Sequence, residues 1–206
     1  MKFSEADIRA RALRGLLRDV PSLPTRGDDD MNDIAPMIPA GVIPKPAAVL
    51  VPIILRDNEP TMLLTQRTDH LSSHAGQVAF PGGRIDAGDV DAVDAALREA
   101  EEETGLARSF VEPLGFLDTY MTVTAYHVVP VVALVKPGFT ITPQANEVSA
   151  VFEVPLRFLM TPEHHEKHSR EWQGKLRYYY AMPYESRYIW GATAGMIRNL
   201  YDRLYA

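Results

Sequence analysis

Residues 74–106, HAGQVAFPGGRIDAGDVDAVDAALREAEEETGL, carry the clearest structural pattern of the sequence. The second half of this stretch predicts an amphipathic helix over residues 90–104, because apolar side chains recur there at helical spacing. Asp89 suits the N-cap of this helix and Gly105 the position just after its end. The apolar face, which must pack on the core, consists of Val93, Ala96, Leu97 and Ala100.

The same helix carries its acidic residues in the run REAEEETG. Glu99, Glu102 and Glu103 gather on one face, whereas Glu101 points away and Arg98 is the only basic residue of the helix. Like charges at these spacings repel by roughly a few tenths of a kcal/mol per pair. A hard divalent cation such as Mg²⁺ or Mn²⁺ would relieve this repulsion, because such ions prefer carboxylate oxygens. The alternative is a solvated acidic face, which is what most charge runs are.

A glycine pair precedes the helix in the segment FPGGR, directly after a predicted strand. Gly82 and Gly83 would let a ligand or an ion approach the backbone closely. A plain tight turn is an equally good interpretation of two adjacent glycines.

Composition limits the class of protein. The 206 residues are 46% hydrophobic and 23% charged, which is typical of one globular domain with accessory elements. A net charge of −6 argues against a large nucleic-acid surface. There is no cysteine, so disulfides and thiolate metal sites are excluded, and no apolar run approaches the length of a membrane span. The charged N-terminal residues do not resemble a secretion signal, and we expect a cytoplasmic protein.

The order of the predicted elements indicates an α/β or α+β domain with a mixed sheet. Residues 4–19 predict a packing helix with Ser4 as N-cap and with Ile8, Leu13, Leu16 and Leu17 at helical spacing. Residues 20–46 hold six of the sixteen prolines and an acidic run, and predict an irregular connector. Residues 68–88 are expected to be mainly loop. Strands are predicted at 47–56, 61–67, 111–123, 127–135, 148–154 and 176–184, and helices at 155–160 and 190–205.

The run REAEEETGL resembles the core of the Nudix box, whose pattern is Gly, five residues, Glu, seven residues, Arg-Glu-apolar-x-Glu-Glu-x-Gly-apolar. The first part departs from this pattern. Counting from Gly83, the acidic position is Asp89 instead of Glu, and eight residues separate it from Arg98. The second part is complete, with Arg98, Glu99, Ala100, Glu102, Glu103, Gly105 and Leu106.

The upstream segment LLTQRTDHLSSHAGQVAFPGG resembles the signature of the coenzyme A diphosphatase branch of the Nudix hydrolases. In that branch, Leu-Leu-Thr-x-Arg and then His-x-Gly-Gln-Val-x-Phe-Pro-Gly-Gly precede a box with the same Asp and the same extra residue. The likeness is continuous over residues 63–106, and the segments NEVSAVFEVPL and IWGATAGMI also resemble the branch.

This resemblance implies a Nudix-type α/β/α sandwich with a mixed sheet over residues 47–206, preceded by the helix and connector of residues 1–46. It implies hydrolysis of the diphosphate of coenzyme A or its acyl derivatives, giving 3′,5′-ADP and 4′-phosphopantetheine, with Mg²⁺ or Mn²⁺ as cofactor. Two alternatives stay open: a Nudix hydrolase for ADP-ribose, NADH or a nucleoside triphosphate, and a non-catalytic nucleotide-binding module. The expected partner is a nucleotide-like small molecule, without nucleic acid or membrane, and a homodimer is an open expectation.

The resemblance also assigns roles to acidic residues. Glu99 and Glu103, one turn apart, are the expected metal ligands. Glu102 is a third ligand or a base toward the bound water, and the Gly83 carbonyl could complete the coordination. Glu147 is a further catalytic candidate, since a loop glutamate in this region joins the site in the wider family. The alternative for Glu147 is an ordinary exposed acid.

The substrate-binding candidates are Arg67, His74, Gln77 and the glycine pair Gly82 and Gly83. Arg67 enters the loop from a strand and could contact phosphate, and a surface arginine is the alternative. Local hydrogen bonding within the loop is the alternative for His74 and Gln77. Arg98 is expected to hold helix and loop together by an ion pair, on a face away from the ligands.

Two further segments are ambiguous. In EHHEKH, His164 and His168 would form a zinc pair if the segment were helical, and a solvated polar segment is the favoured interpretation. The tyrosines at 178–180 could stack on an adenine, but alternation along a strand predicts that at least one ring packs in the core.

Overall fold

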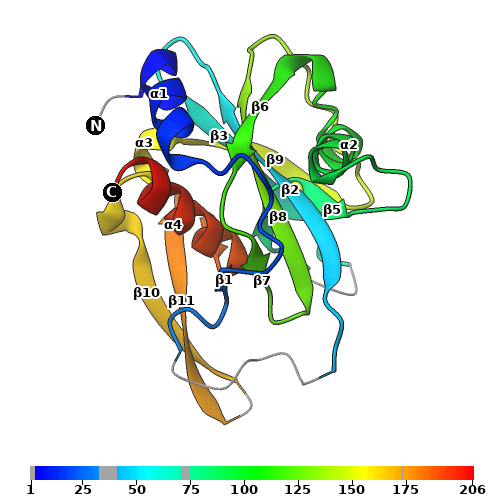
Figure 1. Ribbon diagram of the computed structural model, residues 1–206. Helices are drawn as coiled ribbons and strands as arrows, with labels where there is room; N and C mark the ends of the chain where they lie inside the picture. The colour runs from blue at the N-terminus through cyan, green and yellow to red at the C-terminus, as the bar shows by residue number, and fades with distance from the viewer. Residues whose placement is uncertain (1–2, 33–40, 71–74, 173) are drawn as a thin grey trace.

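Figure 1 shows the computed structural model, which describes residues 3–32, 41–70, 75–172 and 174–206. Within these residues, nine strands form one mixed sheet and three strands form a second, antiparallel sheet. The helices are α1 (Glu5–Gly15), α2 (Ala92–Thr104), α3 (Leu156–Leu159) and α4 (Ala192–Leu204), with short 3₁₀ helices at Arg108–Phe110 and Pro162–His164. The strands of the large sheet are β1 (Arg26–Gly27), β2 (Lys45–Ile54), β3 (Thr61–Arg67), β4 (Val78–Ala79), β5 (Gly82–Arg84), β6 (Val111–Phe116), β7 (Tyr120–Met121), β8 (Tyr126–Val135) and β9 (Val148–Pro155). The small sheet consists of β10 (Glu166–Trp172), β11 (Lys175–Tyr184) and β12 (Arg187–Trp190).

Strands β2 and β8 form the centre of the large sheet. They pair in parallel along their whole length, from Lys45 with Tyr126 to Ile54 with Val135. The strand order is β1-β7-β8-β2-β3-β4, and β5, β6 and β9 pair with β2, β8 and β3. Both central strands are almost continuously apolar, as expected for strands covered on both faces.

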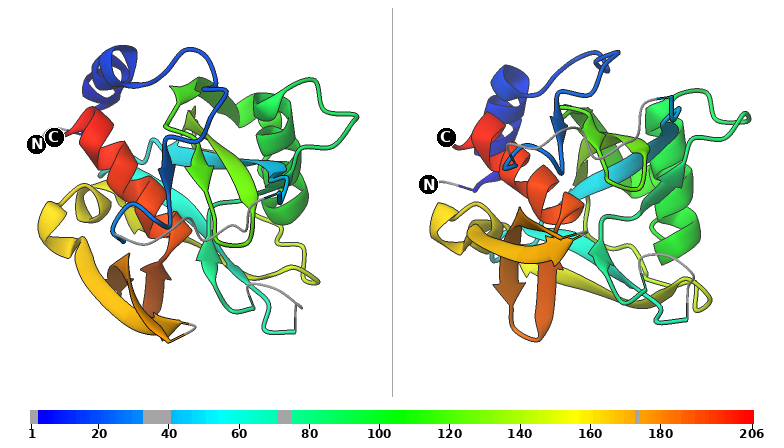
Figure 2. Two further views of the ribbon diagram at one scale, coloured as in Figure 1. Left: turned by 60° about the horizontal axis from the view of Figure 1, so that its bottom comes forward. Right: turned by 90° about the horizontal axis from the view of Figure 1, so that it is seen from below.

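Alternation along β2 divides its side chains between two cores. Val51 and Ile53 face the core that contains α1 and α4, whereas Leu50 and Ile54 face the core that contains α2. Figures 1 and 2 accordingly show α1 and α4 on one side of the large sheet and α2 on the other. The predicted α/β/α sandwich with a mixed sheet is therefore confirmed.

The N-terminal helix belongs to one of these layers. Ser4 Oγ accepts a hydrogen bond from the Asp7 amide at 3.3 Å, so the predicted N-cap is confirmed. Ile8 is fully buried and Leu16 nearly so, but Leu13 is 68% exposed, because it lies on the outer side of α1. The Arg11 guanidinium donates to the Leu204 carbonyl at 2.8 Å and thereby joins α1 to α4.

The predicted connector contains an ordered strand. β1 pairs in parallel with β7, and the Asp28 carboxylate accepts bonds from the Tyr120 hydroxyl at 2.9 Å and from the Val123 amide at 2.8 Å. These bonds fix the described part of the connector against the end of the large sheet. Burial raises the pKa of Asp28 above its ordinary value.

Other boundaries differ from the sequence-based expectation. The acidic helix begins at Ala92 with Asp91 as N-cap, so the assignment of Asp89 to that position was wrong. The segment expected to be loop contains β4 and β5, and the strand expected over 111–123 is divided into β6 and β7. In the described part of the chain, no helix is long and apolar enough to cross a membrane.

Candidate functional site

Helix α2 lies flat on the large sheet. The Asp91 side chain accepts from the Asp94 amide at 2.8 Å, and Gly105 ends the helix with φ of 74°. Its buried face is made of small side chains, Ala95, Ala96 and Ala100, which allow a close approach to the sheet. Glu99 and Glu103, one turn apart, consequently lie against the short strand β5.

Strand β5 is built of glycine because its neighbours leave no room for a side chain. A Cβ atom on Gly82 would lie 2.4 Å from the Ala48 carbonyl oxygen of β2. A Cβ atom on Gly83 would lie 2.4 Å from the Glu99 carboxyl carbon. The glycine pair therefore brings backbone and carboxylates together, and this close approach is the physical reason for both glycines.

Glu103 is the most buried acid of the site. Its side chain is 5% exposed, and its Oε2 accepts from the Gly82 amide at 3.1 Å. The Arg67 Nη1 lies 3.6 Å from Oε1. Burial raises the pKa of Glu103 to about 7, and the charges of Glu99 and Glu147 add to this effect.

Glu99 of α2 and Glu147 of the loop before β9 come from different elements but influence each other electrostatically. Burial raises the pKa of Glu99, and the charges of Glu102 and Glu147 raise it further. Glu147 directly precedes β9, and its loop is tied to α2 because the Gln144 amide donates to the Glu103 carbonyl at 3.0 Å. The structure thus brings Glu147 into electrostatic contact with both Glu99 and Glu103.

Arg98 connects the helix to the loop before it. Its Nε and Nη2 donate to both oxygens of Asp89 at 2.8 and 2.9 Å, and Nη2 also donates to the Arg84 carbonyl at 3.2 Å. The hydrogen bonds from Arg98 lower the pKa of Asp89 to about 2. The expected ion pair between helix and loop is therefore present. The expectation that Arg98 faces away from the acids was wrong, because its Nη1 donates to Glu99 at 3.0 Å and to Glu102 at 3.2 Å.

Glu102 differs from its two neighbours. Its side chain is 56% exposed, and it accepts a hydrogen bond from Arg98 at 3.2 Å. Glu101 points away as expected and lies 3.6 Å from Arg108. No three His, Asp or Glu side chains of the described residues meet in a ready-made metal site. Of the three glutamates expected on one face, Glu99 and Glu103 both lie against β5. Glu102 is on the neighbouring, exposed side of the helix.

The donor set nevertheless suits a hard divalent cation. Glu99, Glu103 and Glu147 offer carboxylate oxygens, and burial raises the pKa of the first two, with a smaller contribution from the repulsion of neighbouring acids. A cation between them would remove this repulsion. The Glu99 carboxylate itself lies against Gly83, where a Cβ atom would be only 2.4 Å from the carboxyl carbon.

Arg67 and Gln77 stand where β3 enters the glycine-containing loop. The Arg67 amide donates to the Gln77 carbonyl at 3.0 Å, so the two residues are held together by backbone. The Nε atom of Arg67 is buried and has no hydrogen-bond partner among the described residues. His74, the remaining candidate of this loop, lies outside the residues that the structure describes.

A large cavity opens beside these residues. Its volume is about 750 Å³, within the usual range for small-molecule sites. Arg67, Gln77, Gly82 and Gly83 line one part of it, and residues of the connector, the central strands β2 and β8, β7, α4 and the small sheet also line it. The layers around it can be followed in the view from below in Figure 2.

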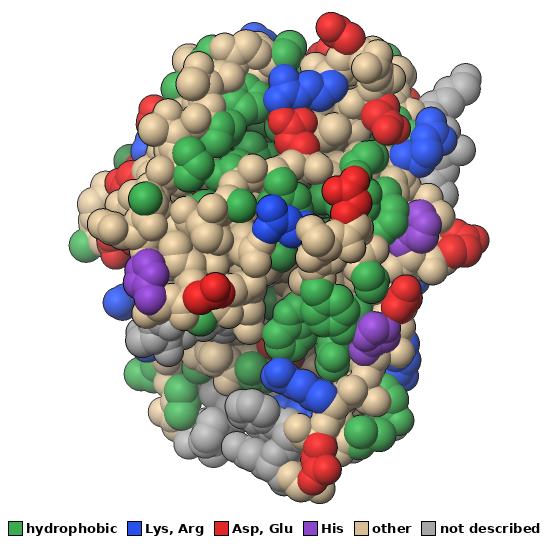
Figure 3. Space-filling view, turned by 180° about the vertical axis from the view of Figure 1, so that it is seen from behind, with side chains coloured by type: hydrophobic (Ala, Val, Ile, Leu, Met, Phe, Trp, Pro, Cys, Tyr) green, Lys and Arg blue, Asp and Glu red, His purple; other side chains and the backbone are tan. Residues whose placement is uncertain are grey.

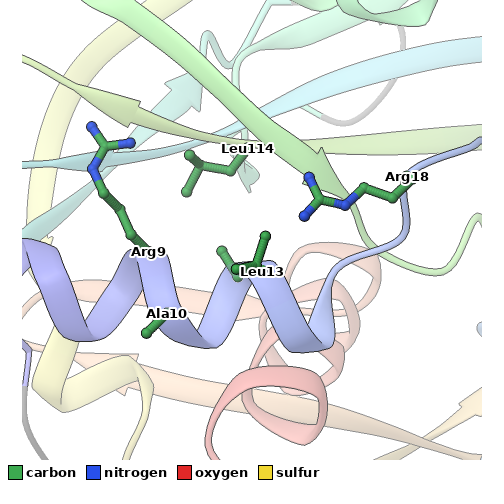
Figure 4. A pocket seen from close by; sticks show the side chains of 6 residues that line it. Arg9, Ala10, Leu13, Arg18 and Leu114 are labelled. Carbon is green, nitrogen blue, oxygen red and sulfur yellow. The ribbon is translucent and has the colours of Figure 1, made fainter.

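A smaller cavity of about 300 Å³ lies between α1 and β6 (Figure 4). Arg9, Leu13, Arg18 and Leu114 are among its lining residues, and no acid or nucleophile of the described chain lines it. The Arg9 guanidinium is engaged by Glu112 at 2.7 and 2.8 Å.

The histidine-rich segment does not form the zinc pair that a helix would give. His164 lies in a 3₁₀ helix and stacks on Phe158, whereas His168 lies in β10 and contacts Glu166 and Tyr188. The two histidines are therefore not on one helical face.

The small sheet holds both residues that the sequence analysis considered and residues that it missed. Tyr180 packs against the core, as alternation predicted, while Tyr179 contacts Trp190 with ring centroids 5.3 Å apart. Arg170 and Arg177 line the large cavity from the same sheet. No motif marks these arginines, and only the pairing register of β10 and β11 brings them together.

Comparison with known proteins first places the chain among the hydrolases. It is 46% identical over 154 residues to a protein of Escherichia coli K12 named as the uncharacterized Nudix hydrolase NudL, covering 75% of this chain and 80% of that protein. The protein of the same name from Yersinia pestis is 44% identical, over 75% of this chain and 77% of its own length. The crystal structure of DR0079 from Deinococcus radiodurans has the same fold, with a TM-score of 0.50 and 13% identity over 82% of this chain and 88% of that one.

The NUDIX domain family matches residues 44–176. The chain therefore belongs to the Nudix family, whose hydrolases act on nucleoside diphosphate derivatives and generally use divalent metal ions.

Proposed function

We propose that this protein hydrolyses the diphosphate bond of coenzyme A or of its acyl derivatives. The observation that carries the proposal is the position of the branch signature in the structure. Its described residues Arg67, Gln77, Gly82 and Gly83 line one wall of the large cavity, beside the buried carboxylate of Glu103. The signature thus adjoins the acids that would hold the metal.

Glu99 and Glu103 would hold a divalent ion, Mg²⁺ or Mn²⁺, with Glu147 as a further acid beside them. Such an ion, when bound, neutralises phosphate charge and lowers the pKa of an attacking water. Glu102 is more exposed than the other two and would act as an outer ligand or as a base toward this water. The Gly83 carbonyl remains a candidate ligand, since a Cβ atom on this residue would meet the Glu99 carboxylate.

Arg67 would orient the substrate. Its guanidinium lies beside Glu103 and at the edge of the cavity, where it could donate to a diphosphate oxygen. Gln77 follows it on the same wall, and Gly82 and Gly83 line the cavity where β5 lies against the Glu99 carboxylate. His74 belongs to the same signature and stays a candidate contact.

In the reaction, the oxygen of water bonds to one phosphorus atom, and the bond from that phosphorus to the bridging oxygen breaks. The bridging oxygen leaves on the other phosphate, and one proton passes to solvent or to a neighbouring carboxylate. From coenzyme A the products are 3′,5′-ADP and 4′-phosphopantetheine.

The test is to incubate the pure protein and Mg²⁺ or Mn²⁺ separately with coenzyme A, ADP-ribose, NADH and dGTP, and to identify the products. We expect rapid release of 3′,5′-ADP from coenzyme A and slow turnover of the other three. If ADP-ribose, NADH or dGTP is hydrolysed faster than coenzyme A, that compound and not coenzyme A is the substrate. Absence of turnover on all four would contradict the proposal.

A further inference from the structure

The large cavity reaches a pair of arginines that the reaction at Glu99 and Glu103 does not use. Arg170 of β10 and Arg177 of β11 both line this cavity. Figure 1 shows their two strands extending below the large sheet. The arginines are direct partners across the antiparallel pair, so their side chains leave the same face of the small sheet.

This arrangement places two like charges opposite each other. Cross-strand partners have Cβ atoms about 5 Å apart, and like charges at that distance destabilise a sheet. Arg177 forms no ion pair with any described residue, and its Nε atom is buried without a hydrogen-bond partner. In contrast, Arg26 and Arg198, which line the same cavity, both pair with Asp202.

Trp190 restrains one of the two guanidinium groups. The guanidinium of Arg170 lies 4.8 Å from the centroid of the Trp190 ring, and Tyr179 packs against the same ring. A guanidinium held in this way loses less conformational entropy when it binds an anion.

The acids that share the cavity are already engaged. Asp28 accepts bonds from Tyr120 and Val123, and Asp30 accepts from the Gly27 amide at 2.9 Å. Asp30 also lies 3.7 Å from Arg26, so both carboxylates have partners of their own.

We infer that Arg170 and Arg177 bind a terminal phosphomonoester of the substrate. Such a group carries close to two negative charges and three free oxygens, and two planar guanidinium groups match it with paired hydrogen bonds. The diphosphate would occupy the part of the cavity lined by Arg67 and Gly82. The ligand is therefore a nucleotide that has both a diphosphate and a separate phosphomonoester. Its identification with the 3′-phosphate of coenzyme A rests on the proposed function.

The test compares the binding of coenzyme A and of 3′-dephospho-coenzyme A, which differ only in this phosphomonoester. Titration calorimetry in EDTA measures both dissociation constants without turnover. For the wild-type protein we expect coenzyme A to bind at least about tenfold more tightly, as charge-assisted hydrogen bonds imply. The ratio of the two dissociation constants, dephospho compound to coenzyme A, should fall below about threefold in Arg177→Gln and in Arg170→Gln. The affinity for the dephospho compound should stay unchanged.

Arg187→Gln is the matched control. Arg187 belongs to the same sheet but stacks on Phe152 and does not line the cavity, so this variant should keep the wild-type ratio. Thermal unfolding of all three variants confirms that the sheet is intact. A wild-type ratio near one, or an unchanged ratio in both pocket variants, would overturn the inference.

The proposed function is tested separately, by turnover with Mg²⁺. If the ratio behaves as expected but coenzyme A is not hydrolysed, the phosphomonoester site stands and the proposed reaction fails. If coenzyme A is hydrolysed but the ratio of dissociation constants is the same in wild type and in both arginine variants, the proposed reaction stands and the phosphomonoester site is wrong.

Discussion

Replacing Gly83 by alanine tests whether the Glu99 carboxylate must lie where the structure has it. The new Cβ atom would be 2.4 Å from the Glu99 carboxyl carbon and 2.5 and 2.6 Å from its oxygens. An ordinary contact begins at 3.4 Å, so the carboxylate would have to move by about 1 Å. The backbone of Gly83 does not need a positive φ, and its pairing with Ala48 is compatible with alanine.

The expected loss is large for activity and small for stability. A displacement of about 1 Å in a catalytic group costs up to about 100-fold in rate. This factor corresponds to about 2.7 kcal/mol of transition-state stabilisation. Glu99 is a flexible side chain that can retreat toward solvent, so the free energy of unfolding should change by less than about 1 kcal/mol.

The assay is steady-state hydrolysis of coenzyme A with Mg²⁺, alongside thermal unfolding. Gly88→Ala is the matched control, because a Cβ atom there meets nothing within 4 Å and its φ is not positive. We expect wild-type turnover for this control. If Gly83→Ala keeps its activity within about threefold of wild type, the position of Glu99 does not matter and its role as a ligand is wrong.

Three other predictions concern different parts of the molecule. Glu103→Gln should abolish turnover with Mg²⁺ and leave the unfolding temperature nearly unchanged, because the amide oxygen can still accept from Gly82; retained turnover would remove Glu103 from the metal site. Hydrogen bonds from Arg203 lower the pKa of Asp118 to about 2, below its ordinary value of 3.8, so its stabilising effect is present above pH 3.8 and is lost as the pH falls toward 2. Urea unfolding at pH 6 and pH 2.5 should show a loss of about 1–2 kcal/mol that Asp118→Asn does not show, and equal losses in both proteins would contradict the ion pair. Ile8→Ala should cost about 2–5 kcal/mol in urea unfolding and Leu13→Ala less than about 0.5 kcal/mol, because only Ile8 is buried; similar effects would mean that α1 does not pack as described.

The acidic helix could be predicted from the sequence because its signals are local. The spacing of Ala96, Ala100, Glu99 and Glu103 fixes which side chains share a face, and Gly105 marks the end. The start was placed two residues too early, because Asp89 and Asp91 are equally good N-caps as isolated residues. The bonds from Arg98 to Asp89 decide between them, and no local rule predicts these bonds.

The walls of the cavity could not be predicted, because they depend on pairings between distant segments. The glycines of β5 carry no strand pattern, and they become a strand only by pairing with β2. Arg170 and Arg177 are seven residues apart in the sequence, and only the register of β10 with β11 makes them neighbours. For Leu13 the sequence predicted a contact that the structure lacks. Its helical spacing suggested burial, but α1 turns it outward.

The extra residue of the box has a structural explanation in this chain. The helix is capped by Asp91, so the additional residue lies in the loop between β5 and α2 and leaves the spacing of Glu99 and Glu103 unchanged. The loop closes on itself, since the Asp86 amide donates to Asp89 at 2.8 Å, and Asp89 in turn receives two bonds from Arg98. The role of this acidic position is to pair with Arg98. Asp89 can fill it from the longer loop, because the role requires only that the carboxylate lies within reach of the arginine. Because Arg98 also donates to Glu99, a change in this loop would be transmitted directly to a residue of the proposed metal site.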